Sequence, residues 1–313
     1  MSWSASDIPD QSGHVAVVTG GNGGLGLETV RELARANAHV VVAARNLDKA
    51  AKAEADVKAE IPTASLEVRA LDLASKASIK KFSEGLLADF DKIDLLFNNA
   101  GIMAVPEGQT EDGFERQFGT NHLGHFYLTY LLMPALLAAG DARVVNTTST
   151  ARFSAGKYDL ENAHSRGSYS PWEAYGISKR ANLHFAIELN DRLAQAGSSV
   201  TAYSADPGFS NTDLQATSAS ASGTLSSKFF KFAVPVVGQS PARGALPQLR
   251  AGTDAAAQSG SLYRPKWVTA GAPVVGKVGD NLRKPQDLRD LWTVSEEDLD
   301  ITFDVPALVA ASK

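Results

Sequence analysis

The chain has 313 residues, no cysteine and a formal net charge of −5. Its length suits one large α/β domain, and apolar residues make up 44 %, enough for a sizeable core. The acidic balance argues against a nucleic-acid-binding surface. The missing cysteines exclude disulfides, thiolate metal sites and cysteine nucleophiles.

The N-terminal residues 1–13 are predicted to form an extension ahead of the domain. They lack the basic start and the apolar run of a signal peptide. No run of about 18 or more apolar residues predicts a transmembrane helix anywhere in the sequence. We therefore expect a cytoplasmic protein with no integral membrane segment.

Apolar, β-branched runs alternate with helical patterns as far as residue 204. Strands are expected at 15–19, 40–44, 66–71, 93–97, 143–147 and 200–204, and helices at 24–36, 46–60, 75–90, 111–138 and 170–196. Several strands are continuous apolar runs, which is typical of a parallel sheet covered by helices on both faces. We predict a three-layer α/β/α, doubly wound parallel sheet, the Rossmann fold.

The pattern changes after Pro207. We expect a flap at about 209–238, a helix at 241–251, a last strand at 261–263 and a charged helical tail at 282–299. The flap contains the apolar run 229–237, which fits a substrate cover, a dimer contact or a membrane-facing surface. The simplest organisation is a single domain over 14–313, with a C-terminal extension over about 265–313. Trp267 and Trp292 are predicted core anchors.

A glycine-rich turn joins the first strand to the first helix, and its predicted ligand-binding members are Thr19, Gly20, Asn22, Gly24, Leu25 and Gly26. Glycines permit a tight turn and the close approach of a pyrophosphate, and the start of a helix offers free N–H groups to phosphates. Because the turn lies between a strand and a helix, it predicts dinucleotide binding. A purely structural turn is the alternative.

The residue after the second strand indicates which dinucleotide binds. An NAD site usually has a carboxylate about 20 residues past the glycines, where it holds the ribose hydroxyls. Here Arg45 stands at that place, and the first carboxylate is Asp48. A guanidinium suits a 2′-phosphate, so NADP(H) is predicted, with a solvated surface arginine as the alternative.

Candidate catalytic residues follow later strands. Tyr175 and Lys179 are one helical turn apart, so they share a helix face, and an ammonium group lowers the pKa of a neighbouring phenol. A phenol tuned in this way can act as a general acid or base. Ser149 follows the strand 143–147 by two positions, at the carboxyl end where its hydroxyl can reach a substrate oxygen. Asn121 lies within a helical stretch, where asparagine is unfavourable, so we expect a kink or a bound water there.

These motifs resemble the short-chain dehydrogenase/reductase family over about residues 14–214. The family's TGxxxGxG, NNAG, YxxxK and PG motifs match the glycine turn, residues 98–101, Tyr175 with Lys179, and Pro207–Gly208. The spacing of 26 positions from 149 to 175 and the segment 291–295 are most similar to the retinol dehydrogenase-like group.

The resemblance implies a role for each matching residue. Tyr175 is the general acid/base, Lys179 lowers its pKa and binds the nicotinamide ribose, Ser149 positions the carbonyl, and Asn121 holds a relay water. Further cofactor contacts are implied for Asp72, Leu73, Asn99, Ala100, Gly101, Pro207, Gly208 and Thr212.

We therefore expect an NADP-dependent oxidoreductase that interconverts a small apolar carbonyl and its alcohol. The family commonly forms homodimers or homotetramers through the helices that bear Asn121 and Tyr175, although the long tail can block one interface. The alternatives are a catalytically silent NADP-binding regulator, a protochlorophyllide reductase-like enzyme and a nucleotide-sugar-modifying enzyme. His122 and His125 are spaced like metal ligands but lack a third partner, so we expect a structural role and no metal.

Overall fold

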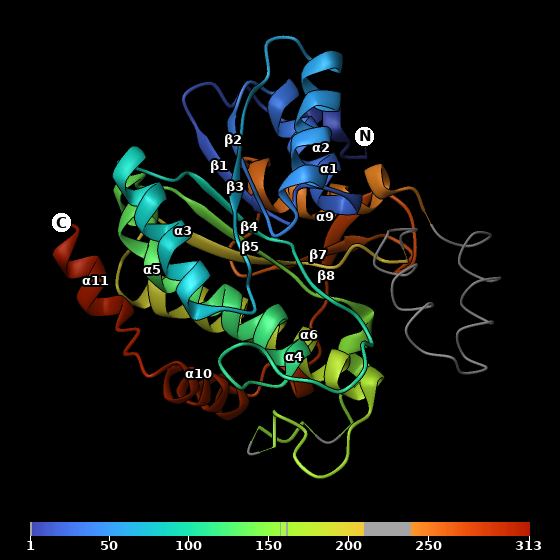
Figure 1. Cartoon of the computed structure of the whole chain (residues 1–313), viewed down its shortest axis with the longest axis vertical. Helices are drawn as coiled ribbons and strands as arrows, with labels where there is room; N and C mark the ends of the chain where they lie inside the picture. The colour runs from blue at the N-terminus through green and yellow to red at the C-terminus, as the bar shows by residue number, and fades with distance from the viewer. Residues whose placement is uncertain (1, 157, 161, 210–238) are drawn as a thin grey trace.

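The computed structural model describes residues 2–156, 158–160, 162–209 and 239–313 (Figure 1). Its strands are β1 (Val15–Thr19), β2 (His39–Ala44), β3 (Ser65–Ala70), β4 (Leu95–Asn98), β5 (Arg143–Thr147), β6 (Thr201–Ala205), β7 (Leu262–Pro265) and β8 (Pro273–Gly276). They form one sheet in the order β3-β2-β1-β4-β5-β6-β7-β8. All neighbouring pairs are parallel except β7 with β8.

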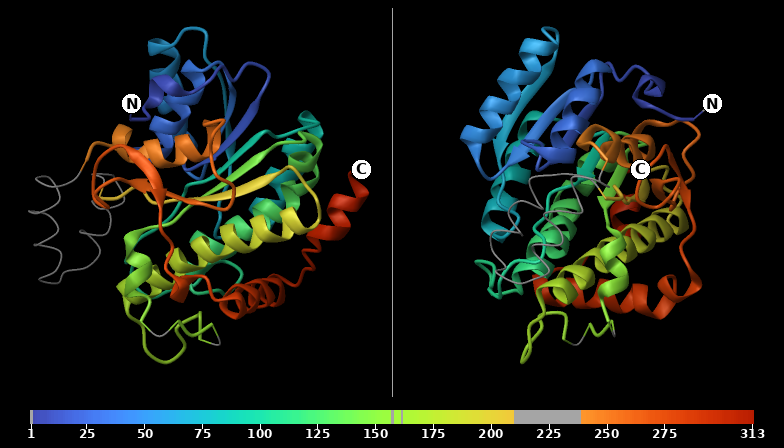
Figure 2. Two further views of the ribbon diagram at one scale, coloured as in Figure 1. Left: turned by 180° about the vertical axis from the view of Figure 1, so that it is seen from behind. Right: turned by 90° about the vertical axis from the view of Figure 1, so that its right-hand side faces the viewer.

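Helices cover both faces of this sheet, as Figures 1 and 2 show. On one face, α1 (Gly24–Arg35), α2 (Leu47–Glu60) and α9 (Pro241–Thr253) share an apolar core with the strands. On the other face, α3 (Lys76–Asp89), α5 (Gly124–Ala138) and α6 (Pro171–Gln195) enclose a second core. The predicted doubly wound, three-layer Rossmann fold is therefore confirmed.

The strands follow directly from their sequences. Residues 40–44 of β2 are at most 3 % exposed, since both faces of the strand lie under helices. Side-chain caps then fix where the next helices begin: Asn46 Oδ1 accepts from Lys49 N at the start of α2, and Ser75 Oγ accepts from Ser78 N at the start of α3.

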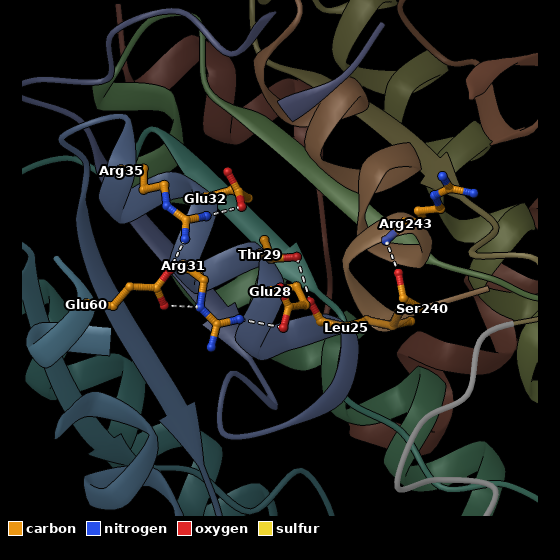
Figure 3. A network of polar contacts seen from close by, with 9 residues as sticks. All are labelled: Leu25, Glu28, Thr29, Arg31, Glu32, Arg35, Glu60, Ser240 and Arg243. Atoms are coloured by element: carbon orange, nitrogen blue, oxygen red, sulfur yellow. Dashed lines mark hydrogen bonds and ion pairs between the residues drawn. The ribbon is translucent and has the colours of Figure 1, made fainter. Parts of the chain in front are cut away.

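Ion pairs connect the first two helices on the outer surface (Figure 3). Glu60, at the end of α2, pairs with both Arg31 and Arg35 of α1, and Arg31 Nε lies 2.9 Å from Glu60 Oε2. Within α1, Thr29 Oγ1 donates to the carbonyl of Leu25 at 2.9 Å. Each exposed pair contributes little alone, but a network that shares one carboxylate holds α1 in a defined place behind the glycine turn.

The predicted helix over 111–138 is wrong at its start. Residues 111–115 form a turn with Gly113 at φ +86° and an isolated bridge between Gln109 and Glu115. The helix begins with α4 (Arg116–Phe118), widens into a π-helical segment, η2 (Gly119–Leu123), and continues as α5. Glu115 caps this start by accepting from the N–H groups of Gln117 and Phe118.

Several short elements escaped the sequence analysis. They are the strand β8, the helix α11 (Val305–Ala311) and the 3-10 segments η1 (Ala5–Asp7), η3 (Thr150–Ser154) and η4 (Asp280–Leu282). The charged tail forms α10 (Pro285–Leu299) as expected, within three residues at its start. In the ranges that the structure describes, no helix combines the length and the hydropathy needed to cross a bilayer.

The C-terminal elements complete the core of one face. α10 packs on α6, and α11 packs on α5 and α6. Trp292 is 2 % exposed, and its ring lies 5.0 Å from Phe126 and 4.9 Å from Phe303. Trp292 is therefore the core anchor that we expected. Trp267 is not, because it lies on the loop after β7 and is 70 % exposed.

Replacing Trp292 with alanine should lower the free energy of unfolding by about 3–5 kcal/mol, because it removes a large buried ring and leaves a cavity. Urea denaturation followed by circular dichroism measures this change. Trp267→Ala is the matched control and should shift the free energy by less than about 0.5 kcal/mol. Equal effects of the two variants would show that the tail does not contribute to the core.

Candidate active site

A cavity of about 510 Å³ lies at the carboxyl ends of the central strands. From β1 the chain adds β2 and β3 on one side of the sheet and then β4, β5 and β6 on the other, so the strand order switches between β1 and β4. Open α/β sheets bind ligands at such switch points. The predicted site residues that line the cavity are Gly20, Asn22, Gly24, Leu25, Gly26, Asn99, Ala100, Gly101, Ser149, Tyr175, Lys179, Pro207 and Gly208. The fold therefore brings together motifs from almost 190 positions of the chain (20 to 208).

The glycine turn has the geometry of a phosphate-binding loop. Gly20 and Gly24 have φ values of +68° and +53°, which favour glycine. A Cβ on Gly26 would lie 2.6 Å from Asn99 Nδ2 and even closer to the carbonyl of Gly20, so no side chain fits there. The turn leads straight into the first turn of α1, whose residues Gly24, Leu25 and Gly26 line the cavity. These residues fit the pyrophosphate of a dinucleotide.

Thr19 connects this turn to the loop after β4. Its Oγ1 accepts hydrogen bonds of 2.9 Å from the N–H groups of Asn99 and Ala100. His125 lies 2.9 Å from the same oxygen through Nε2, and its Nδ1 donates to the carbonyl of Asn121. Burial lowers the pKa of His125 to about 4, so the ring is neutral and Nε2 accepts from Thr19. Thr19 is thus buried behind the cavity and positions its wall.

The catalytic candidates meet on the opposite wall. Ser149 lies beside Tyr175, and its hydroxyl acts on the ionisation of the phenol. The Lys179 ammonium nitrogen lies 5.8 Å from the centre of the Tyr175 ring and donates to the carbonyl of Thr147 at 3.2 Å. Tyr175 is 5 % exposed and Lys179 is 3 % exposed. The Tyr175 phenol, the Ser149 hydroxyl and the Lys179 ammonium therefore converge in one corner of the cavity, where Tyr175 and Lys179 are largely shielded from solvent.

Burial dominates the ionisation of this corner. It raises the pKa of Tyr175 above 10, and the Ser149 hydroxyl opposes that rise only in part. Desolvation disfavours the phenolate, so the protonated phenol is the favoured form, and the lowering of its pKa by Lys179 stays a prediction. Burial also lowers the pKa of Lys179 to about 8, and the charge of Asp206 opposes that shift. At neutral pH the phenol is protonated and the amine is largely charged.

Asn121 lies in the π-helical segment η2, which departs from a regular α-helix at the place where we expected a kink. Its amide nitrogen donates to the carbonyl of Ile102 and to Ser178 Oγ, both at 2.9 Å, and its Oδ1 accepts from Ile102 N at 2.8 Å. Asn121 therefore fastens the loop after Gly101 to α6. It does not line the cavity.

Three of the predicted cofactor contacts lie beyond the cavity, at the β2–β3 end of the same sheet edge. Arg45 is exposed after β2, and no other residue in the described part of the chain holds its guanidinium. Asp72 follows β3 and accepts from Ala74 N at 2.9 Å, and Leu73 is buried next to it. Thr212 and the flap from 210 to 238 lie outside the described residues.

The cavity also contains residues that the sequence analysis missed. Lys49, in the first turn of α2 and four positions after Arg45, lines it and adds a second cation to this part of the chain. On the tyrosine side, Met103, Trp172 and Phe209 form an apolar and aromatic wall. The only sequence signal for Lys49 is its spacing from Arg45, because a lysine in an Ala/Lys/Glu-rich helix otherwise indicates a solvated face.

Both histidines of the HxxH pair make hydrogen bonds within the protein. His122 is fully buried, donates from Nε2 to Ser295 Oγ at 2.8 Å, and packs against Phe118 and Phe126. Burial lowers its pKa to about 3. Among the residues that the structure describes, no group of three or more possible ligands could hold a metal ion. The expected structural role for His122 agrees with these contacts.

A phosphate-binding turn and a buried tyrosine–lysine pair at the switch point of a doubly wound sheet define a nicotinamide-dinucleotide oxidoreductase class. Residues 14–223 match the family model described as short chain dehydrogenase. The chain therefore belongs to the short-chain dehydrogenase family, whose members use NAD or NADP. Within the family it is retinol dehydrogenase-like.

Individual relatives agree with this assignment. Retinol dehydrogenase 12 of Mus musculus is 46 % identical over 196 residues, which cover 63 % of this chain and 61 % of the relative. Polyprenol dehydrogenase of Mus musculus is 42 % identical over 211 residues, with 66 % and 63 % covered. The chain thus spans about three fifths of these relatives. The crystal structure of an uncharacterized protein from Mycobacterium Paratuberculosis superimposes with a TM-score of 0.78 at 36 % identity, covering 97 % of this chain and 99 % of that one.

Gly26→Ala should weaken NADPH binding by about 5- to 150-fold, since its Cβ would force the glycine turn away from Asn99 and overpacking of this kind costs about 1–3 kcal/mol. NADPH fluorescence titration measures the dissociation constant. Gly85→Ala on α3 is the control, because its Cβ would meet only Arg69 Nη1 at 3.6 Å. Unchanged binding by a folded Gly26→Ala protein would contradict the phosphate-binding role of the turn.

Proposed function

We propose that the protein is an NADP-dependent oxidoreductase that interconverts an apolar carbonyl and its alcohol, with Tyr175 as the general acid/base. The observation that carries this proposal is the convergence of Tyr175, Ser149 and Lys179 in the cavity that also contains the glycine turn. When bound, the nicotinamide supplies or accepts the hydride.

The proposed division of labour follows from the contacts. Ser149 and Tyr175 both line the cavity and lie beside each other, so a substrate oxygen placed between their hydroxyls can accept a hydrogen bond from each. In the reduction, the Tyr175 hydroxyl donates its proton to that oxygen, and in the oxidation the phenolate takes it back. Burial keeps the phenol protonated at neutral pH, which favours the reductive direction. The Lys179 ammonium binds the ribose hydroxyls and stabilises negative charge on the phenol oxygen.

The preference for NADP rests on two cations at one end of the site. Arg45 is exposed and unpaired within the described ranges, and Lys49 lines the cavity four positions later, on α2. A planar guanidinium and an ammonium together suit the 2′-phosphate, and the carboxylate that an NAD site uses is missing at position 45. Asp72 and Leu73 are assigned to the adenine side.

The substrate class rests on the apolar wall of Met103, Trp172 and Phe209 beside Tyr175. The names of the two mouse relatives, retinol dehydrogenase 12 and polyprenol dehydrogenase, agree with a long apolar alcohol or aldehyde. The substrate-covering role of the flap at about 209–238 and the cofactor contact of Thr212 stay predictions. The single domain over 14–313, the cytoplasmic location and a homodimer or homotetramer stay predictions.

Tyr175→Phe should reduce NADPH-dependent turnover of decanal or all-trans-retinal by at least about 100-fold, because the general acid is lost. NADPH binding should stay within about threefold of the native value, since the ring is retained. Absorbance at the NADPH band measures turnover, and fluorescence measures binding. Tyr130→Phe on α5, a partly exposed tyrosine stacked on Tyr127, is the matched control and should keep full activity.

Two results would contradict this mechanism. Activity retained by Tyr175→Phe would remove the tyrosine from the proton transfer. A native protein that binds NADPH tightly but turns over no aldehyde or ketone of the panel would favour the catalytically silent regulator.

Arg45→Asp should raise the dissociation constant for NADPH by about 10- to 100-fold relative to NADH, because hydrogen bonds to a charged group contribute about 1.5–3 kcal/mol. Lys49→Ala should act in the same direction with a smaller effect. Parallel fluorescence titrations with NADPH and NADH measure the ratio. Arg283→Asp, an exposed arginine beside η4, is the control. An unchanged ratio in Arg45→Asp would reject the assignment of NADP.

A further inference from the structure

A buried glutamine connects the two segments that supply part of the apolar wall of the cavity. Gln117 belongs to α4 and is completely buried. Its Oε1 accepts from Ala104 N at 2.7 Å. Its Nε2 donates to Tyr169 Oη at 2.8 Å and to the carbonyl of Pro171 at 2.9 Å. One side-chain amide therefore ties the loop after β4 to the segment that enters α6.

The chemistry of the partners fixes the orientation of this amide. The N–H of Ala104 is a donor, so it needs the amide oxygen, and the carbonyl of Pro171 is an acceptor, so it needs the amide nitrogen. Neither a carboxylate nor an apolar side chain at position 117 can satisfy both. Because Gln117 and Ala104 are at most 3 % exposed, a lost contact would leave a buried polar group without a partner.

The loop that Gln117 holds has an unusual backbone. Ala104 has φ +48°, in the left-handed region that a residue with a Cβ rarely adopts. Such a conformation persists only where surrounding contacts impose it. Gln117 supplies one of these contacts, and the carbonyl of the next residue, Val105, accepts from Tyr169 Oη at 2.9 Å. The chain that follows Met103 is therefore held in one defined conformation.

We propose that Gln117 is a positioning residue that sets the shape of the substrate side of the cavity. Ala104 directly follows Met103, and Met103 lines the cavity. Likewise, Pro171 directly precedes Trp172, which lines the cavity 69 positions further along the chain (103 to 172). Gln117 is not among the lining residues, so it acts through these neighbours. The inference rests on the proposed function, because it names what selects a long apolar substrate over a short one.

The test compares a long aldehyde, decanal, with a short one, propanal, using NADPH and the full chain. Gln117→Met keeps a side chain of similar size and removes all three hydrogen bonds. It should lower kcat/KM for decanal by about tenfold or more, chiefly through KM, because a misfit of one methylene in an apolar pocket changes kcat/KM by about 10- to 200-fold. The value for propanal should change by less than about threefold, since propanal needs only the proton donor and the nicotinamide.

A second variant guards against a folding failure of Gln117→Met. Tyr169→Phe removes one hydroxyl from a half-buried side chain and leaves both backbone contacts of Gln117 in place. It should lower the preference for decanal over propanal by about two- to tenfold, the effect of one neutral hydrogen bond. In both variants the dissociation constant for NADPH should stay within about twofold of the native value, because neither change touches a residue that we assign to the dinucleotide.

Gln11→Met is the matched control. Gln11 is also a buried glutamine with three partners, which are the carbonyls of Pro9 and Asp10 and the ring of His14. It precedes the amino end of β1, whereas the cavity lies at the carboxyl ends of the strands. Its replacement should lower the thermal stability and leave the preference for decanal unchanged.

The preference for decanal over propanal decides the inference. An unchanged preference in both folded variants, Gln117→Met and Tyr169→Phe, would overturn it, as would an equal loss of preference in Gln11→Met. If the native protein turns over neither aldehyde, the proposed function fails, and calorimetric titration with decanol in the absence of cofactor tests the inference separately. Decanol binding should weaken about tenfold in Gln117→Met, and unchanged binding would reject the positioning role.

Discussion

The site depends on one close approach, between the glycine turn after β1 and the loop after β4. Gly26 leaves no space for a side chain against Gly20 and Asn99, and Thr19 clamps the same two segments with its single hydroxyl. Because both segments leave the sheet at its switch point, this contact sets the floor of the cavity. The site can work only if α6, which carries Tyr175, and the strand ends on the other side of the cavity are correctly placed relative to this floor.

The opposite wall is organised by desolvation. A buried phenol keeps its proton, a buried amine tends to lose its own, and one carboxylate behind the wall offsets part of that tendency. At one and the same pH, Tyr175 is therefore a neutral acid and Lys179 is a cation. General acid catalysis beside an anionic ligand requires such a pair of groups. The apolar side chains of Met103, Trp172 and Phe209 line the same cavity.

Regular and local features were predictable from the sequence, and long-range ones were not. The predicted strands are apolar runs between turn residues, and the observed bounds of each lie within two residues of the predicted bounds. The start of α4 was missed because Gly113 adopts a positive φ inside an apparently helical pattern, and β8 because four residues, Pro273–Gly276, become a strand only beside β7. Motif spacing located Tyr175, Lys179 and Ser149. The contacts of Gln117 carry no local signal, since its amide joins segments that are 67 positions apart (104 to 171).

The π-helical segment around Asn121 makes this part of the chain sensitive to length. The wide turn of a π-helical segment accommodates one extra residue, and an α-helix rotates by about 100° per residue. The extra residue therefore changes the direction in which all side chains on one side of the segment point. Removing a residue between 119 and 123 would restore regular winding and swing either Phe118 or His125 out of its present neighbourhood. A single-residue deletion would detach the loop at Ile102 from α6 and carry the disturbance to the reaction centre.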